Sequence, residues 1–200
     1  MDDLYLRNAA KPTGKVGTEV LTRMNEHHKE LADWAFSHVS IAHDATALDV
    51  GCGGGANLER LLNLCPQGTV LGVDYSPTSV QTSVEHNQAA VDTGRLSVQE
   101  ASVDNLPFPD SSIDFVNACE TVYFWPNVVH GLTEIHRVLK PKGNLLIICE
   151  MADPSDPRFA GVNYLTVYEP EELRKLVQQA GFDDTELFQQ GEQFRIVASR

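Results

Sequence analysis

Short apolar runs alternate with longer segments of helical period along most of the chain. Five runs rich in β-branched and aliphatic residues predict strands: Thr46–Val50, Thr69–Asp74, Leu96–Gln99, Ile113–Ala118 and Asn144–Glu150. Runs that are apolar at nearly every position are typical of strands covered on both faces. Because helical segments separate them, the pattern predicts an α/β fold with a doubly wound, mostly parallel sheet and right-handed crossovers.

Two of the intervening segments carry helix signals. The hydroxyl of Ser76 can cap a helix whose first residue is Pro77. Three valines at helical spacing are expected to share one face of it: Val80, Val84 and Val91. A second helical stripe runs from Val128 to Leu139, and Gly143 is its predicted stop signal.

The C-terminal part adds a helix and a hairpin. Pro170–Gly181 combines a proline start, acidic residues in the first turn and a glycine stop. Two extended runs follow, Asp184–Leu187 and Gln193–Ala198, and a short polar linker containing Gly191 separates them. We therefore expect a terminal hairpin.

The first 45 residues stand outside this alternation. Val20, Met24, Leu31 and Trp34 predict a helix outside the sheet, and a segment with the composition of a mobile loop precedes it, Lys11–Gly17. We expect this region to form a helical lid or extension over residues 1–45. The remaining residues, 46–200, are predicted to form one globular unit.

Composition narrows the possible partners. The chain has 200 residues, 42% hydrophobic and 22% charged, which suits one globular domain. Its formal net charge of -13 disfavours nucleic acid and anionic membrane surfaces. No signal-like leader or membrane-length apolar run is present, and the four cysteines form no CxxC pair. We expect a cytoplasmic protein with free thiols, as a monomer or a homodimer.

The most informative stretch is LDVGCGGGA, residues 48–56, which follows the first predicted strand. Glycines let a backbone turn sharply and approach a ligand, and the next helix would present free amides to an anionic group. Gly51, Gly53 and Ala56 fit the G-x-G-x-x-A dinucleotide pattern. The alternative D-x-G-x-G-x-G pattern begins at Asp49 and places a carboxylate where a cationic group would need it.

A second carboxylate, Asp74, ends the second predicted strand and lies 19 residues after Gly55. This is close to the offset of about 20 residues at which an acidic residue meets ribose hydroxyls. A carboxylate can accept from two hydroxyl donors at once. The sequence therefore predicts a ribose-containing ligand here; the alternative is a solvent-facing aspartate that begins a turn.

Four motifs together resemble the class I S-adenosylmethionine (SAM)-dependent methyltransferases. The likeness is to the small-molecule, type 11 branch with ubiquinone/menaquinone C-methyltransferase-like proteins, and it extends from about Leu48 to Gly181. The motifs are LDVGCGGG, VDYSP at 73–77, NLPFPDSSID at 105–114 and EIHRVLKPKG at 134–143. The resemblance implies a Rossmann-like, seven-stranded sheet with an antiparallel strand from the last hairpin, SAM as cofactor and S-adenosyl-L-homocysteine as product.

The resemblance also assigns residues to the cofactor. Around the methionine part it places Asp49, Gly51 and Gly53. It places Asp74 at the ribose hydroxyls, Tyr75 beside the adenine, and Ser102 and Val103 at the adenine edge. Further candidates for the cofactor site are Cys52, Asn57 and Ser76. That branch usually has an acidic residue at the position of Ser102, so we expect a weaker or water-bridged contact with the adenine amino group.

The loop after the fourth predicted strand is expected to border the methyl acceptor. Glu120 is a candidate neighbour of the methionine part and a candidate catalytic residue. Tyr123 and Trp125 are candidates for the walls of an apolar substrate pocket, although such aromatics also pack cores. His28 shares a predicted apolar helix face with Met24, where it could act as a base or serve as a structural histidine.

The remaining histidines show no metal-like clustering, since His130 and His136 are six residues apart, so we predict no metal site. The predicted function is methyl transfer from SAM to a small molecule with an apolar or aromatic portion. The alternatives are a SAM-binding sensor or structural subunit without turnover, a methyltransferase with a protein or RNA acceptor, and an NAD-dependent oxidoreductase. The last is disfavoured because no Tyr-x-x-x-Lys pair is present.

Overall fold

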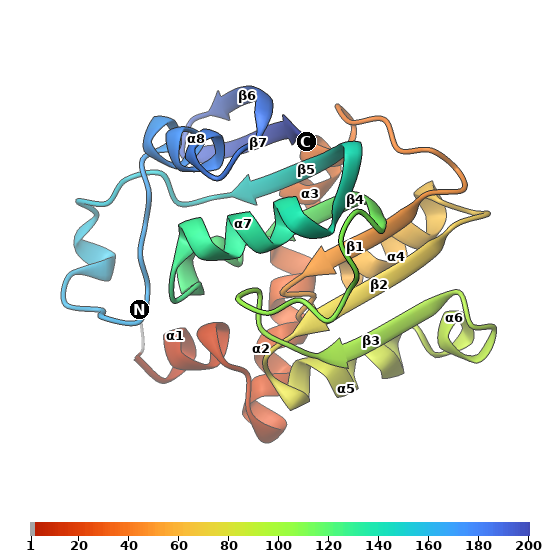
Figure 1. Cartoon of the computed structure of the whole chain (residues 1–200). Coiled ribbons are helices and arrows are strands. Elements are labelled where there is room, and N and C mark those ends of the chain that lie inside the picture. The colour runs from red at the N-terminus through yellow and green to blue at the C-terminus, as the bar shows by residue number, and fades with distance from the viewer. Residues whose placement is uncertain (1–2) are drawn as a thin grey trace.

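A computed structural model describes residues 3–200 and has one seven-stranded sheet (Figure 1). Its strands are β1 (Thr46–Val50), β2 (Thr69–Asp74), β3 (Leu96–Glu100), β4 (Ile113–Cys119), β5 (Leu139–Cys149), β6 (Asp183–Gln190) and β7 (Gln193–Ser199). In space they are ordered β3-β2-β1-β4-β5-β7-β6. The first five are parallel, and β7 runs antiparallel to β5 and to β6. The predicted doubly wound sheet with an antiparallel C-terminal hairpin is confirmed.

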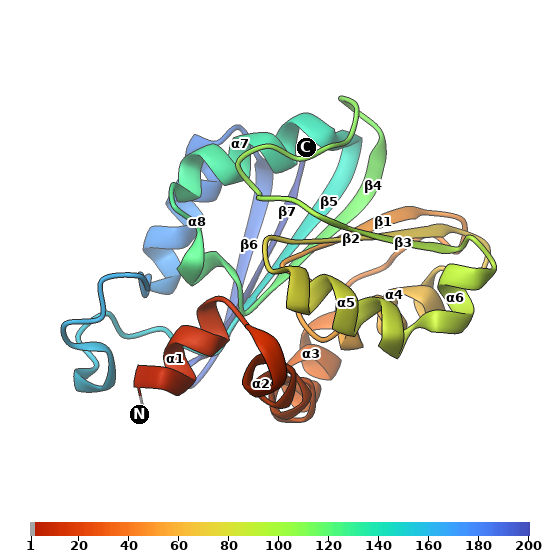
Figure 2. The same ribbon diagram turned by 90° about the horizontal axis from the view of Figure 1, so that it is seen from below.

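Helices cover both faces of the sheet. They are α1 (Asp3–Ala10), α2 (Gly14–His27), α3 (Lys29–Phe36), α4 (Ala56–Leu64), α5 (Pro77–His86), α6 (Gln88–Asp92), α7 (Val128–Val138) and α8 (Pro170–Gln179), with short 3-10 turns at Val122–Phe124 and Pro157–Phe159. In Figure 2, α7 and α8 lie on one face and α3 to α6 on the other. None of these helices is long and apolar enough to cross a bilayer.

Strand β5, in the interior of the sheet, shows why the predicted strands are apolar at nearly every position. Leu145 and Ile147 pack in the core on the α7 and α8 side, whereas Leu146 and Ile148 pack in the core that includes α3 and α4. All four side chains are fully buried. Because successive strand residues face opposite sides, a strand between two helical layers must be apolar at every position.

The helix predicted after Ser76 differs from the prediction. It ends at His86, and Val91 belongs to the separate helix α6. Ser79 and Ser83, rather than the valines, form its buried face. The reason lies in the glycine loop, which packs closely here: Oγ of Ser83 donates to the carbonyl of Gly53 (2.8 Å). Larger side chains would hold the loop away from the helix.

Two other helix boundaries were wrong. Helix α7 ends at Val138, β5 begins at once at Leu139, and Gly143 lies inside that strand rather than at a helix stop. A Cβ at Gly143 would lie 2.9 Å from the Lys140 carbonyl, so the glycine serves close backbone packing. The N-terminal helix through His28 is in fact two helices, since α2 ends at His27 and α3 begins at Lys29.

Candidate functional site

The carboxyl ends of β1, β2 and β4 meet at one edge of the sheet, where α1 and α2 lie across them (Figure 1). A crevice there is lined by the glycine loop after β1, by Asp74 and Tyr75 at the end of β2, and by Cys119–Thr121 at the end of β4. Residues of α1, α2 and the intervening loop form its outer wall. The switch in strand order between β1 and β4 is the usual ligand position in open α/β sheets.

Three glycines of the loop have left-handed backbone angles: Gly51 (φ 73°), Gly53 (φ 51°) and Gly55 (φ 85°). The N–H groups of Gly51 and Cys52 both donate to the carbonyl of Val73, at 2.8 and 3.1 Å. A Cβ on Gly51 would lie 2.2 Å from Oγ1 of Thr121. Glycine is therefore required at position 51 by both the backbone angle and the close approach of the loop after β4.

Asp74 is held in a fixed orientation. The Gly53 N–H donates to its Oδ2 (3.0 Å) and the Ser76 N–H donates to its Oδ1 (2.9 Å). Burial raises the pKa of Asp74 above its usual range, and these two amide donors oppose that shift. Each oxygen retains a lone pair, so the carboxylate can still accept from ligand hydroxyls.

Asp49 lies beneath the loop and is not among the residues that line the crevice. Its Oδ1 accepts from Nδ2 of Asn117 (2.6 Å), whereas its buried Oδ2 has no partner among the described residues. Burial, and secondarily the negative charge of Asp74, raises the pKa of Asp49 to about 7. A buried carboxylate oxygen without a donor is suited to a cationic group or a water molecule.

An apolar crevice adjoins the first on the side of β3. Its lining includes Val73, Tyr75, Ser102, Val103 and Trp125. Ser102 and Val103 thus lie beside Asp74 and Tyr75, with which the resemblance grouped them, but Trp125 lies with them and lines a different space from Tyr123. The hydroxyl of Tyr75 donates to the Ala10 carbonyl, so the N-terminal segment contacts the crevice directly.

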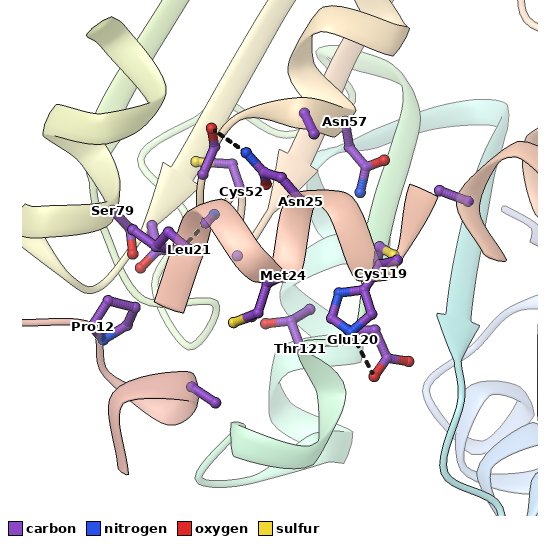
Figure 3. Close-up of a pocket in the computed structure, with 18 of the residues that line it drawn as sticks. Pro12, Leu21, Met24, Asn25, Cys52, Asn57, Ser79, Cys119, Glu120 and Thr121 are labelled. Atoms are coloured by element: carbon purple, nitrogen blue, oxygen red, sulfur yellow. Dashed lines mark hydrogen bonds and ion pairs between the residues drawn. The ribbon is translucent and has the colours of Figure 1, made fainter. Parts of the chain in front are cut away.

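The predicted residues Cys52 and Asn57 both line the main crevice, as does Cys119 (Figure 3). Ser76 does not line it: its buried hydroxyl caps α5 through the Ser79 N–H and donates to the Pro12 carbonyl (2.6 Å). Several lining residues were missed by the sequence analysis: Leu21, Met24, Asn25, Lys29, Arg60 and Thr121. Most belong to the N-terminal helices, and no motif marked them.

A cavity of about 660 Å³ opens beside the crevice. Met24, His28, Glu120 and Phe124 line both spaces, so the crevice and the cavity meet at these side chains. Tyr123 lines the cavity with its ring, while its hydroxyl donates to Oε1 of Glu120 (3.2 Å) and accepts from the Met151 N–H (3.0 Å). The cavity is thus bordered by apolar and charged groups together.

The charged groups at this boundary come from three segments. Nε2 of His28 is 3.6 Å from Oε1 of Glu150 and 4.0 Å from Oε2 of Glu120. Burial, and then the negative charge of Glu150, raises the pKa of Glu120 well above its usual range. The pKa of Glu150 is lowered, because contacts with His28 and His27 outweigh the opposing effect of its partial burial.

Known proteins resemble both the sequence and the fold. The family described as "Methyltransferase domain" matches residues 48–147, which is half of the chain. The chain belongs to this family. An O-methyltransferase, resE, from Aspergillus sclerotiorum is 30% identical over 182 residues, 87% of this chain and 64% of its own length. A 2-phytyl-1,4-naphtoquinone methyltransferase from Nostoc punctiforme is 34% identical over 121 residues, 60% of this chain and 52% of its own length.

A solved SAM dependent methyltransferase from Aquifex aeolicus shares the fold of this methyltransferase domain, with a TM-score of 0.75 at 21% identity. The alignment covers 91% of this chain and 97% of that one. The chain spans between half and two thirds of the length of the two curated relatives above. Family membership confirms the resemblance drawn from the four sequence motifs.

The residues of this methyltransferase domain fit the cofactor SAM. The glycine loop leaves backbone room beside Asp74, whose oriented carboxylate suits ribose hydroxyls. Lys29 and Arg60 line the same crevice, where both also contact Asp33, and they supply positive charge that suits a carboxylate of the ligand.

Proposed function

We propose that this protein transfers a methyl group from SAM to a small-molecule acceptor. The observation that carries the proposal is the junction of the crevice beside the glycine loop with a second cavity at shared side chains, among them Met24, His28 and Glu120. Two ligand spaces that meet at one point are what a group transfer between two bound molecules requires. The names of the relatives, an O-methyltransferase and a naphthoquinone methyltransferase, also support a small organic acceptor.

The protein's part in the reaction is mainly alignment. When bound, SAM supplies an electrophilic methyl group on a positively charged sulfur, which leaves as a neutral thioether. An acceptor atom in the cavity attacks the methyl carbon, the carbon–sulfur bond breaks, and its electron pair remains on sulfur. Fixing the two partners in line contributes up to about 7–11 kcal/mol in well-oriented systems. His28 and Glu120 border this point, and their catalytic roles stay predictions.

The cavity supports an acceptor with an apolar portion. Phe124, Met151, Phe159 and Leu165 contribute apolar surface to it, and the hydroxyl of Tyr123 is turned away to Glu120 and the Met151 N–H. An apolar surface combined with a few placed polar groups is typical of small-molecule sites. His28 and Glu120 lie where the cavity meets the crevice, and a second polar group, the Arg158–Glu192 ion pair with Gln190 and Gln193, lines another part of the cavity.

Incubation with methyl-labelled SAM tests the proposal, with separate fractions of small metabolites, protein and RNA offered as acceptors. We expect label in the small-molecule fraction, and phenols, quinols and enols are the first pure compounds to test. If label enters only protein or RNA, the acceptor is a macromolecule and the small-molecule proposal is wrong. SAM binding without transfer to any fraction would favour the sensor alternative.

A further inference from the structure

Three metal-ligating side chains gather where the crevice and the acceptor cavity meet. Nε2 of His27 is 3.2 Å from Oε2 of Glu150, and Nε2 of His28 is 3.6 Å from Oε1 of the same carboxylate. Ligand atoms from the three residues all lie within 4.8 Å of one another. Two ligands of one tetrahedral zinc ion, each at about 2.1 Å, would be about 3.4 Å apart. The measured separations therefore suit a shared cation.

The local backbone brings the two histidines together. Consecutive residues of a regular helix point in different directions and do not face a common partner. Here α2 ends at His27, and His28 has φ −84° and ψ 3° before α3 begins. As a result the two rings lie with centroids 5.1 Å apart, and both reach the one carboxylate of Glu150. A continuous helix would direct only one of them there.

A second carboxyl group lies beside the three side chains. Glu120, with 8% of its surface exposed, puts a carboxyl oxygen within 4.0 Å of Nε2 of His28. Imidazole nitrogens and carboxyl oxygens gathered at one place are ligand types that a divalent cation of the zinc class takes.

We propose that His27, His28 and Glu150 bind one divalent cation of the zinc class, with a coordination position open toward the acceptor cavity. Two histidines and one carboxylate are a ligand set of catalytic zinc sites, which keep a further position for water or substrate. Glu150 and both histidines line the cavity, so an acceptor in it can reach the ion. The prediction of no metal site rested on the spacing of histidines along the sequence, which gives no sign that Glu150 lies beside His27 and His28.

The assignment of an acceptor class rests on the proposed methyl transfer. With a bound cation at this point, the acceptor group is expected to be a hydroxyl, phenol or enol. A cation next to such an oxygen makes its proton easier to remove. The oxygen–hydrogen bond breaks, the proton passes to water in the cavity, and the oxygen attacks the methyl carbon as the carbon–sulfur bond breaks toward sulfur. Because the Nε2 lone pair of His28 is then held by the ion, the ion replaces the predicted base role of His28.

Calorimetric titration of the chelator-treated full chain with Zn²⁺ tests the site, with Co²⁺ absorption spectra as a second readout of coordination. We expect one ion per chain. His27→Ala and Glu150→Gln should each weaken Zn²⁺ binding at least tenfold, since even outer-shell partners are worth about 10–100-fold. The matched control is His86→Ala, which removes a histidine that faces only one glutamate, Glu59, at 3.4 Å. It should leave Zn²⁺ binding unchanged.

Equal Zn²⁺ affinity in the wild type, His27→Ala and Glu150→Gln would overturn the metal site. The side chain of His27 is 67% exposed and Gln keeps the shape of Glu150, so both variants should fold, which circular dichroism checks. Titration with SAM separates the two proposals. If the chain binds SAM but no Zn²⁺, the metal site is wrong and the methyltransferase proposal stands. If it binds Zn²⁺ but no SAM, the metal site stands and the methyltransferase proposal is wrong.

Discussion

The cofactor crevice and the acceptor cavity share a boundary, but they are built from different kinds of chain segment. The inner wall of the crevice is formed by short loops at the ends of β1 and β2, and backbone amides of the glycine loop tie them together by donating to Val73 and Asp74, whereas α1 to α3 supply the outer wall. The cavity collects side chains from α1, the α2–α3 junction, the turn after β4, the loop after β5 and the C-terminal hairpin. A site made of local loops leaves a sequence motif, whereas one assembled from distant segments does not.

The largest expected effect that tests this comparison is on the free energy of unfolding, and it concerns Asp49, which lies beneath the glycine loop. Its folded-state pKa of about 7 lies well above the unfolded value, so between about pH 4 and 7 the folded chain holds a proton that the unfolded chain releases. Stability contributed by this proton is present below pH 4 and lost as the pH rises to 7. Relative to Asp49→Asn, the wild type should lose up to about 4 kcal/mol of unfolding free energy across this window.

Denaturant unfolding of both proteins at several pH values measures this difference. Other ionisable groups are common to the two chains and cancel. A difference that stays constant from pH 4 to 7 would mean that Asp49 is ionised in the folded protein throughout, and the burial argument for this carboxylate would fail.

The tight packing of the glycine loop can be isolated with a matched pair of variants. Gly51 and Gly94 have nearly equal backbone angles, φ 73° and 72°, but a Cβ meets Thr121 at the first and nothing within 4 Å at the second. Both alanine variants suffer the left-handed strain of about 1–2 kcal/mol. Gly51→Ala should lose about 1–3 kcal/mol more, from overpacking. Equal losses of unfolding free energy would show that the loop can move away from Thr121.

Asp74→Ala sharpens the assignment of the crevice to the cofactor. Loss of the carboxylate leaves ribose hydroxyls unpaired, so SAM should bind more weakly by about 1–3 kcal/mol, about 5- to 150-fold. Calorimetry with SAM measures the change. The exposed Asp92, at the end of α6, gives a control, and its alanine variant should bind SAM normally. Unchanged affinity in Asp74→Ala would remove this residue from the site.

The smallest expected effect is a gain in the affinity for SAM. Ser102 lines the crevice on the β3 side, where the resemblance predicts the adenine and where an acidic residue is usual in that branch. Ser102→Asp should strengthen SAM binding by about 0.5–1.5 kcal/mol, because a carboxylate accepts the adenine amino group better than a hydroxyl. Asn105→Asp makes a similar charge change in the same loop, outside the crevice lining, and should have no effect. If Ser102→Asp and Asn105→Asp change the affinity for SAM equally, the adenine does not lie beside Ser102.

The sequence predicted the sheet and the glycine loop well for a physical reason. Strand residues such as Leu145 to Ile148 must be apolar throughout when helices cover both faces, and Gly51 must be glycine where the backbone is left-handed and crowded. Both constraints act on consecutive residues and so leave a pattern. The carboxylate of Asp74 follows from the same logic, because it ends the strand next to the loop.

The missed features depend on contacts between distant residues. No local signal joins His27 to Glu150, which is 123 residues away, or marks the break at His28 that lets both histidines reach it. The serine face of α5 likewise exists because a separate loop packs against it. Trp125 was predicted to wall the acceptor pocket together with Tyr123, but Tyr123 lies within the turn Val122–Phe124 and lines the cavity, whereas Trp125 follows the turn and lines the crevice on the β3 side.

Calorimetric titration of the full chain with SAM, and separately with NAD, tests the central claim most directly. The glycine loop fits both a SAM motif and a dinucleotide motif, so this pair of ligands decides what the crevice binds. We predict that SAM binds with one molecule per chain, that Asp74→Ala weakens it, and that NAD gives no binding heat. Tight binding of NAD with no binding of SAM would contradict the account.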